Sequence, residues 1–170
     1  MKEGGSRPVL NIQRTWDYLA IDIISLVLCL LGLGLVAMYW SQMPEKVAAH
    51  FDAAGRPNCY QPRAVLWYLS GGASLIWVLF TLMSCFPHKF NYPGVITEAN
   101  AARQYVLAMR LLGWLKLEYA ALLFFCVGSC IDVTLHPDRA LNSPVLVAFL
   151  ISILGTVGFY LSRLLRGSRI

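Results

Sequence analysis

Charged residues are scarce in this chain, and recognisable catalytic motifs are missing. Charged side chains make up 14% of the 170 residues, whereas soluble globular domains contain ~25%. Apolar residues make up 58% and the mean hydropathy is +0.59, which excludes an ordinary soluble core. The chain has no nucleotide-binding glycine loop, no metal-ligand cluster at a recognisable spacing and no nucleophile motif. We therefore expect a protein that is not an enzyme and that uses no cofactor or metal.

The cysteines do not have the distribution of a disulfide framework. Cys29, Cys85 and Cys126 fall within apolar stretches, where a free thiol packs as a small hydrophobic group. Cys59 and Cys130 are the two that could meet in an oxidising compartment. The sequence leaves open whether these two are bridged.

Four long apolar stretches occupy most of the chain, at residues 18–39, 65–86, 111–131 and 144–161. Each approaches or exceeds the ~20 residues that a helix needs to cross ~30 Å of hydrocarbon. The sequence therefore predicts an all-α integral membrane protein in which four transmembrane helices form one antiparallel bundle over residues 1–170. Its first partner is the lipid bilayer.

The distribution of Lys and Arg predicts the orientation of the helices, because these residues are retained on the cytoplasmic side. Nine of them fall on one side: Lys2, Arg7, Arg14, Lys89, Arg103, Arg110, Arg163, Arg166 and Arg169. Four fall on the other: Lys46, Arg56, Arg63 and Arg139. Both termini are therefore expected in the cytoplasm. The net charge of +5 then reflects topology and contact with anionic headgroups, and no nucleic-acid partner is expected.

The loop between the first two apolar stretches carries the most distinctive string in the chain. Pro44 suits the first turn of a short helix, and the segment from Asp52 to Pro57 is typical of a turn in which Gly55 is free to take positive φ. We therefore predict a short extracytoplasmic helix followed by a turn. His50 and Asp52 have two interpretations: a contact with a ligand, a metal or a proton, or hydrogen bonds to backbone that stabilise the turn.

Three charged residues, Asp22, Lys116 and Glu118, lie inside the apolar stretches, where charge is costly. Asp22 and Lys116 have similar predicted depths, so they can form an interhelical ion pair. Residues 116 and 118 are ~200° apart around a helix, so Glu118 needs a different partner, which the sequence does not identify. One interpretation is structural: the residues form a salt bridge, or the Lys116 side chain reaches the membrane interface. The alternative is that Glu118, with Lys116, lines a polar cavity for a proton, an ion or a ligand headgroup.

The segment before the third apolar stretch predicts a helix that begins after Thr97 as N-cap and continues into the membrane. Arg103, Arg110 and Trp114 fall within ~40° of one another around that helix. This cationic and aromatic stripe is expected to anchor the helix at the cytoplasmic interface. A docking face for a cytoplasmic regulator is the alternative.

Two separated motifs resemble a known bacterial membrane family. The string MPEKVAAHFDAAGRPNCY follows the first apolar stretch, and ITEANAARQYVLAMRLLGWLKLE follows the second. Over residues 18–118 the chain resembles domain of unknown function 1648, which also forms the N-terminal part of SdpI-like immunity proteins. The pattern of that family falls on Met43, Pro44, His50, Phe51, Asp52, Gly55 and Pro57, with Asn58 in place of the more usual aspartate. The resemblance implies a multi-pass protein of the bacterial plasma membrane and, for SdpI-like members, immunity to a toxin and control of a repressor at the membrane.

Three hypotheses for the function remain open. In the first, the protein is a non-enzymatic sensor or immunity protein whose outer loop meets an extracellular peptide or toxin. In the second, it is a small carrier or ion-coupled transporter that uses Asp22, Lys116 and Glu118. In the third, it is a membrane enzyme acting on lipid or peptide, which ranks lowest because no set of acid, base and nucleophile is present.

Overall fold

The structure is a computed structural model that describes residues 7–167, so Lys2 and Arg169, which entered the orientation argument, lie outside the described residues. The described chain has four long helices: α1 (Trp16–Tyr39), α2 (Val65–Met83), α3 (Ala101–Leu135) and α4 (Ser143–Gly167). The connection from α1 to α2 holds β1 (Lys46–Phe51) and β2 (Pro57–Pro62), and a 3-10 helix, η1 (Pro87–Lys89), precedes α3. The fold is thus mostly helical.

All four helices are long and apolar enough to cross a membrane. This confirms the predicted multi-pass membrane protein. The helices also extend beyond some of the apolar stretches: α3 starts at Ala101 and α4 continues to Gly167. Backbone hydrogen bonding does not need an apolar side chain, so a helix continues into polar surroundings after its hydrophobic part ends.

The start of α3 differs from the prediction. The helix begins at Ala101, with Asn100 at the N-cap position, rather than directly after Thr97. Thr97 opens a hydrogen-bonded turn in which its N–H donates to Asn100 Oδ1 at 2.9 Å and its carbonyl accepts from the Ala101 N–H at 2.9 Å. The N-cap prediction is wrong because the Asn100 side chain stabilises this turn. The predicted continuity into the third apolar stretch is confirmed, since α3 is a single helix of 35 residues.

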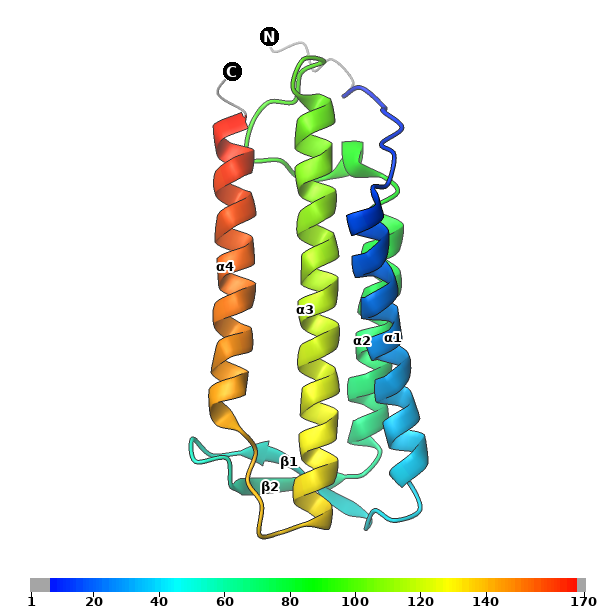
Figure 1. The fold of residues 1–170 in the computed structure, drawn as a ribbon, viewed down its shortest axis with the longest axis vertical. Coiled ribbons are helices and arrows are strands. Elements are labelled where there is room, and N and C mark those ends of the chain that lie inside the picture. The colour runs from blue at the N-terminus through cyan, green and yellow to red at the C-terminus, as the bar shows by residue number, and fades with distance from the viewer. Residues whose placement is uncertain (1–6, 168–170) are drawn as a thin grey trace.

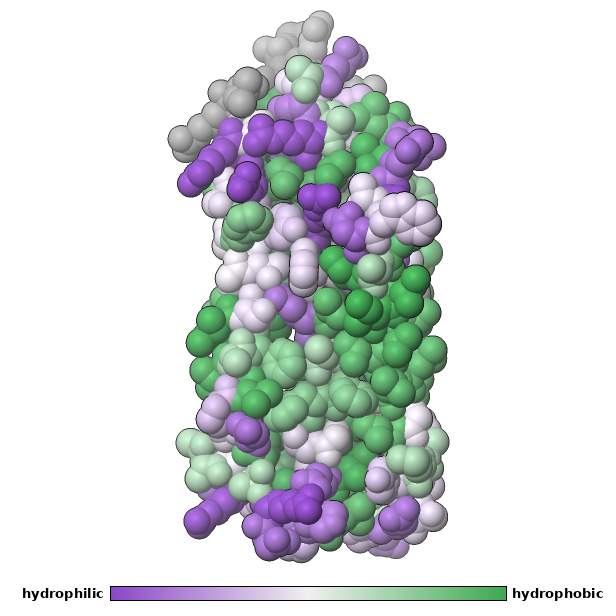
Figure 2. Space-filling model, viewed as in Figure 1, coloured by the Kyte–Doolittle hydropathy of each residue, from purple (hydrophilic) through white to green (hydrophobic). Residues whose placement is uncertain are grey.

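The helices lie along the long axis of the molecule, and α3 is the central one. It packs against α1, α2 and α4, and α1 also packs against α2. Helix α4 packs mainly against α3, and Leu164 and Gly167 are its buried residues. Figure 1 shows the start of α1 and the end of α4 at one end of the molecule, with the β1–β2 hairpin at the other. Figure 2 shows a largely hydrophobic middle between two more hydrophilic ends.

The connection between α1 and α2 corrects the predicted short helix. It forms an antiparallel β-hairpin in which Val47 pairs with Gln61 and Ala48 pairs with Tyr60. Val47 and Ala48 are fully buried, and Val47 packs in a core that also contains Val36 from α1. Pro44 suits the first turn of a helix, but the interstrand hydrogen bonds and the burial of the first strand decide the conformation here.

The predicted turn at the tip of this hairpin is confirmed. Gly55 has φ +77°, and the Asp52 Oδ1 atom accepts a hydrogen bond from the Arg56 N–H at 2.9 Å. The hydrogen-bonding role considered for Asp52 is therefore present. All five cysteines are free, so Cys59 and Cys130 are not bridged.

Candidate functional site

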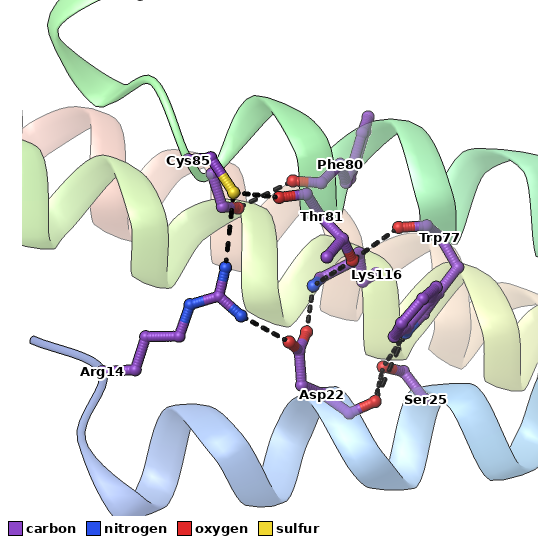
Figure 3. Close-up of polar contacts among 9 residues, drawn as sticks. Arg14, Asp22, Ser25, Trp77, Phe80, Thr81, Cys85 and Lys116 are labelled. Carbon is purple, nitrogen blue, oxygen red and sulfur yellow. Dashed lines mark hydrogen bonds and ion pairs between the residues drawn. The ribbon is translucent and has the colours of Figure 1, made fainter.

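Asp22, Lys116 and Glu118, the three charged residues predicted at membrane depth, belong to two separate sites, each built around one residue of α3. The first contains the predicted ion pair: Lys116 Nζ from α3 contacts Asp22 Oδ1 from α1. Lys116 also donates a hydrogen bond to Thr81 Oγ1 on α2 at 3.1 Å. Its ammonium group therefore joins all three of the mutually packed helices (Figure 3).

Further groups complete the surroundings of this pair. The Trp77 indole N–H donates to Ser25 Oγ at 3.0 Å and lies 3.3 Å from the Asp22 carbonyl oxygen, while the Lys116 ammonium lies 5.4 Å from the Trp77 ring centroid. Arg14 approaches Asp22 Oδ2 at 3.5 Å from outside the cluster (Figure 3). We refer to the following residues as the closed cluster: Asp22, Ser25, Trp77, Thr81 and Lys116.

The closed cluster is suited to a structural role. The Lys116 side chain is 0% exposed, and its charge is compensated by a carboxylate, a hydroxyl and an aromatic face. A buried charge with a complete set of partners has no free position for a ligand. Removing Asp22 would leave the buried Lys116 ammonium without a carboxylate, whereas removing Lys116 would leave Asp22 with the more distant Arg14, so the pair is important for the packing around it.

The second site surrounds Glu118, which contacts α4 instead of α1 and α2. Its Oε1 atom accepts hydrogen bonds from Ser152 Oγ and Thr156 Oγ1, each at 2.7 Å. Its Oε2 atom is buried and has no hydrogen-bond partner within residues 7–167. The predicted separation of residues 116 and 118 around the helix is confirmed, because they contact different neighbouring helices.

A cavity of about 400 Å³ adjoins this carboxylate between α3 and α4. Aromatic and polar side chains line it. We refer to the lining residues as the open site: Trp114, Glu118, Ser152, Thr156, Phe159 and Tyr160. Ser152 and Phe159 are exposed, so the cavity reaches the molecular surface. The open site combines a carboxylate that lacks one partner with an accessible space beside it.

Sequence reasoning missed Ser152 and Thr156. A signal was available, because hydroxyl residues four positions apart lie on the same face of a helix. Hydroxyls on an apolar helix commonly bond to its own backbone or to a neighbouring helix. The sequence alone does not distinguish these cases, since the choice depends on which helix packs opposite.

The residues predicted as an outer contact lie on the hairpin and have different environments. His50 is exposed on β1, Phe51 is half-buried against the core, and Pro57 begins β2. Gly55 contacts the loop between α3 and α4: its carbonyl accepts a hydrogen bond from the Leu141 N–H at 2.9 Å. A Cβ atom on Gly55 would lie 2.0 Å from the Leu141 carbonyl oxygen, so this close approach requires glycine.

The first strand of the hairpin is also bonded directly to α3. The Ala48 N–H donates to Thr134 Oγ1 at 3.0 Å, and Thr134 in turn donates to the Cys130 carbonyl at 2.6 Å. At the base of the hairpin, the Arg63 guanidinium donates to the carbonyl oxygens of Trp40 and Met43. The hairpin is therefore attached to α1, to α3 and to the loop that leads into α4.

The predicted cationic and aromatic stripe on α3 is exposed along its length, at Arg103, Arg110 and Trp114. Arg110 pairs with Asp17 on α1 at 3.2 Å. Trp114 ends the stripe and also lines the cavity beside Glu118. The structure thus joins the stripe to the open site, while the hairpin residues lie at the other end of the molecule.

Comparison with known protein families gives one match, which covers the end of α1, the hairpin and the start of α2. Residues 27–71 match a domain of unknown function, DUF1648. This confirms the resemblance for the segment that contains the first motif. The second motif, which begins at Ile96, lies outside the match. No curated protein and no solved structure matches the chain.

The DUF1648 segment coincides with one structural unit. It contains the whole hairpin and the parts of α1 and α2 that lead into and out of it. Gly55, Arg63 and the buried residue Val47 all lie within it. All residues of the closed cluster and of the open site lie outside this segment: Asp22 and Ser25 precede it on α1, and the others follow it.

Proposed function

We propose that this chain is a non-enzymatic, multi-pass protein of the bacterial plasma membrane that senses or gives immunity to an envelope-active peptide or toxin. In this proposal the helices cross the bilayer in alternating directions as an antiparallel bundle. Both termini face the cytoplasm and the hairpin faces outward. The excess of Lys and Arg on the side of the termini supports this orientation.

The attachment of the hairpin to α3 is the observation that carries the proposal. The Ala48 to Thr134 hydrogen bond joins the hairpin to the last turn of α3. Helix α3 continues from there to Ala101, where it meets the segment that contains Tyr92. A rigid helix that contacts an outer receptor element at one end and a cytoplasmic segment at the other is suited to carry a change between them.

The exposed side of the hairpin supplies groups for contact with a partner. His50, Asn58 and Tyr60 are exposed, and Tyr60 has 55% of its surface accessible. Tyrosine is enriched in protein interfaces because its large ring is rigid and carries a polar group. At the other end, Arg103 and Arg110 offer a basic surface to a cytoplasmic regulator. The resemblance to SdpI-like immunity proteins, which are paired with a toxin and a repressor, supports the same assignment.

Survival of cells challenged with a panel of cationic, neutral and anionic envelope-active peptides tests the proposal. The double variant His50→Ala with Tyr60→Ala changes exposed side chains and leaves the buried strand residues intact. The control is His88→Ala, which removes a histidine side chain at the opposite end of the molecule. We expect protection by the native protein and by the control, and loss of protection in the double variant at equal membrane levels.

A different outcome would contradict the proposal. If no peptide in the panel distinguishes cells with the protein from cells without it, the immunity assignment is wrong. If the double variant protects as well as the native protein, the exposed face of the hairpin is not the contact surface.

The open site favours a second candidate, a small carrier or ion-coupled transporter. Of the three charged residues considered for transport, Asp22 and Lys116 belong to the closed cluster, so Glu118 is the one beside an accessible cavity. Uptake of organic cations and alkali ions into vesicles containing the purified protein tests this candidate. Transport that disappears in Glu118→Gln would support a carrier, and transport that is unchanged would exclude this site.

A further inference from the structure

Two arginines continue the face of α4 that lines the open site. Phe159, Arg163 and Arg166 follow one another at spacings of four and three residues, so they lie on one side of the helix. The Arg163 guanidinium carbon lies 5.1 Å from the centroid of the Phe159 ring, and that ring lines the cavity. Because helical side chains tilt toward the N-terminus of their helix, the charge of Arg163 lies at the edge of the open site.

The positive charge at this end of α4 is not compensated. No carboxylate within residues 7–167 pairs with Arg163 or Arg166, whereas other arginines of the chain do pair with aspartates. Arg103 from α3 reaches the same place: its guanidinium carbon is 3.8 Å from the position of a Cβ atom on Gly167. A cluster of cations without a carboxylate produces a positive potential that attracts an anion.

The open site supplies hydrogen-bond donors next to this charge. Within residues 7–167, the Trp114 indole N–H and the Tyr160 hydroxyl donate to no acceptor, and both side chains line the cavity. Tryptophan and tyrosine are enriched at the depth where headgroups meet hydrocarbon, because each joins a large ring to one polar group. From the end of α4 inward, the surface therefore offers cations first, and then donors on aromatic rings.

We propose that the junction of α3 and α4 binds an anionic phospholipid, with its phosphate at Arg163 and Arg166 and its ester carbonyls at Trp114 and Tyr160. Phosphate and ester carbonyls follow one another in such a lipid in the same order as the cations and donors on the protein. Phosphatidylglycerol, with a net negative charge, is favoured over phosphatidylethanolamine, whose ammonium group would lie beside arginines. A soluble acidic protein segment fits less well, because the Arg163 charge lies against a ring of the cavity.

Glu118 does not oppose a phosphate in this position. Its carboxyl group is bonded to Ser152 and Thr156, which precede Phe159 by three to seven residues and so lie about 5–10 Å deeper along α4. Glu118 is also only 9% exposed. A phosphate beside Arg163 therefore lies away from this carboxyl group.

This inference goes beyond the proposed function of the hairpin and does not depend on it. The lipid site is formed by α3 and α4, and it needs no partner at the hairpin. Failure of one proposal leaves the other standing, because the peptide challenge and the binding experiment below measure different surfaces.

Native mass spectrometry of the full-length protein, released from detergent micelles after titration with dioleoylphosphatidylglycerol, tests the inference by counting bound lipids. We expect saturable binding of the first lipid, about ten-fold tighter than that of dioleoylphosphatidylethanolamine. Arg163→Gln with Arg166→Gln changes two exposed side chains, so this double variant should fold. Each basic residue near a membrane surface contributes about five-fold in affinity, so we expect about 25-fold weaker binding.

The chain offers a matched control with the same local arrangement. Lys89 on η1 lies with its Nζ atom 5.1 Å from the centroid of the exposed Phe86 ring, at the same end of the molecule as the end of α4. Lys89→Gln removes one positive charge there and should change binding by less than about two-fold, whereas Arg163→Gln alone should weaken it about five-fold. Tyr160→Phe keeps the ring and removes the hydroxyl, and should weaken binding about two- to five-fold.

Four results would overturn the inference. Equal affinity of the native protein for the two lipids would show that the site does not select a net negative charge. Native affinity in the double arginine variant would place the lipid elsewhere. Equal losses in Lys89→Gln and Arg163→Gln would show a general attraction to the basic end of the molecule. Displacement of phosphatidylglycerol at equal concentration by inorganic phosphate, or by a polyglutamate peptide, would assign the arginines to a free anion or to an acidic protein.

Discussion

The closed cluster and the open site both place a charged residue of α3 inside the apolar part of the molecule, only two positions apart, but they differ in how that charge is compensated. Lys116 lies on the side of α3 that meets both α1 and α2, and it finds a carboxylate, a hydroxyl and aromatic rings there. Glu118 lies on the side that meets α4 and finds two hydroxyls. A side of the helix with two neighbours can enclose a charge, whereas a side with one neighbour leaves it next to an accessible space.

This difference predicts that the two sites contribute unequally to stability. A charge that is enclosed and paired contributes to the packing of three helices and is expensive to disturb. A buried carboxyl group with one unpaired oxygen contributes less to stability, because the cost of the unsatisfied oxygen offsets part of what its two hydrogen bonds provide. Substitutions in the closed cluster should therefore cost more stability than matched substitutions in the open site.

The largest expected effect is the loss of stability on breaking the closed cluster. Lys116→Met leaves the buried Asp22 carboxylate with Arg14 as its one ion-pair partner among the described residues, so we expect the free energy of unfolding to fall by about 3 kcal/mol, the lower end of the range for breaking a buried pair. Sodium dodecyl sulfate titration of the purified protein in mixed micelles, followed by circular dichroism, measures this. The double variant Lys116→Met with Asp22→Asn should recover most of the loss; equal losses in the single and double variants would show that the pair is not coupled.

Removing both hydroxyls from the open site should have a smaller effect. Ser152→Ala with Thr156→Val leaves the Glu118 carboxyl without its two donors, and we expect a loss of about 2 kcal/mol in the same titration. Thr81→Val in the closed cluster is the matched control for removing one hydroxyl. If this double variant loses as much free energy of unfolding as Lys116→Met, the two sites are equally important for stability and the proposed difference between them is wrong.

Trp77→Phe tests a peripheral bond of the closed cluster. The change keeps an aromatic ring beside Lys116 and removes the indole N–H that donates to Ser25 Oγ. We expect a loss of about 1 kcal/mol, because one buried hydrogen bond disappears while the ion pair remains. Ser25→Ala should produce a loss of similar size, and the double variant should lose little more than either alone. Fully additive losses would contradict a shared bond.

Glu118→Gln should have the smallest effect on stability. The amide oxygen of glutamine can accept the same two hydroxyl hydrogen bonds, so we expect a change of less than about 1 kcal/mol. A variant that loses several kcal/mol of stability would show that Glu118 serves packing in the same way as Lys116, and the contrast between the two sites would fail.

Sequence patterns were most informative where local chemistry dominates. The Asp22 to Lys116 pair follows from two charges at similar depth, each of which needs a partner inside an apolar environment. The turn at the hairpin tip follows from Asp52 and Gly55, which have strong conformational preferences of their own. The short helix predicted at Pro44 is wrong, because propensity at one position is weaker than the pairing of two strands and the burial of Val47.

The number and apolar character of the membrane-spanning segments were determined by the sequence alone, because hydrocarbon accepts only long apolar helices with satisfied backbones. Which charge is enclosed and which is left open was decided by tertiary structure. That outcome depends on how many helices meet each side of α3, and Ser152 and Thr156 become partners of Glu118 only because α4 packs there. Helix neighbours are set by the packing of whole surfaces, which no local pattern in this chain encodes.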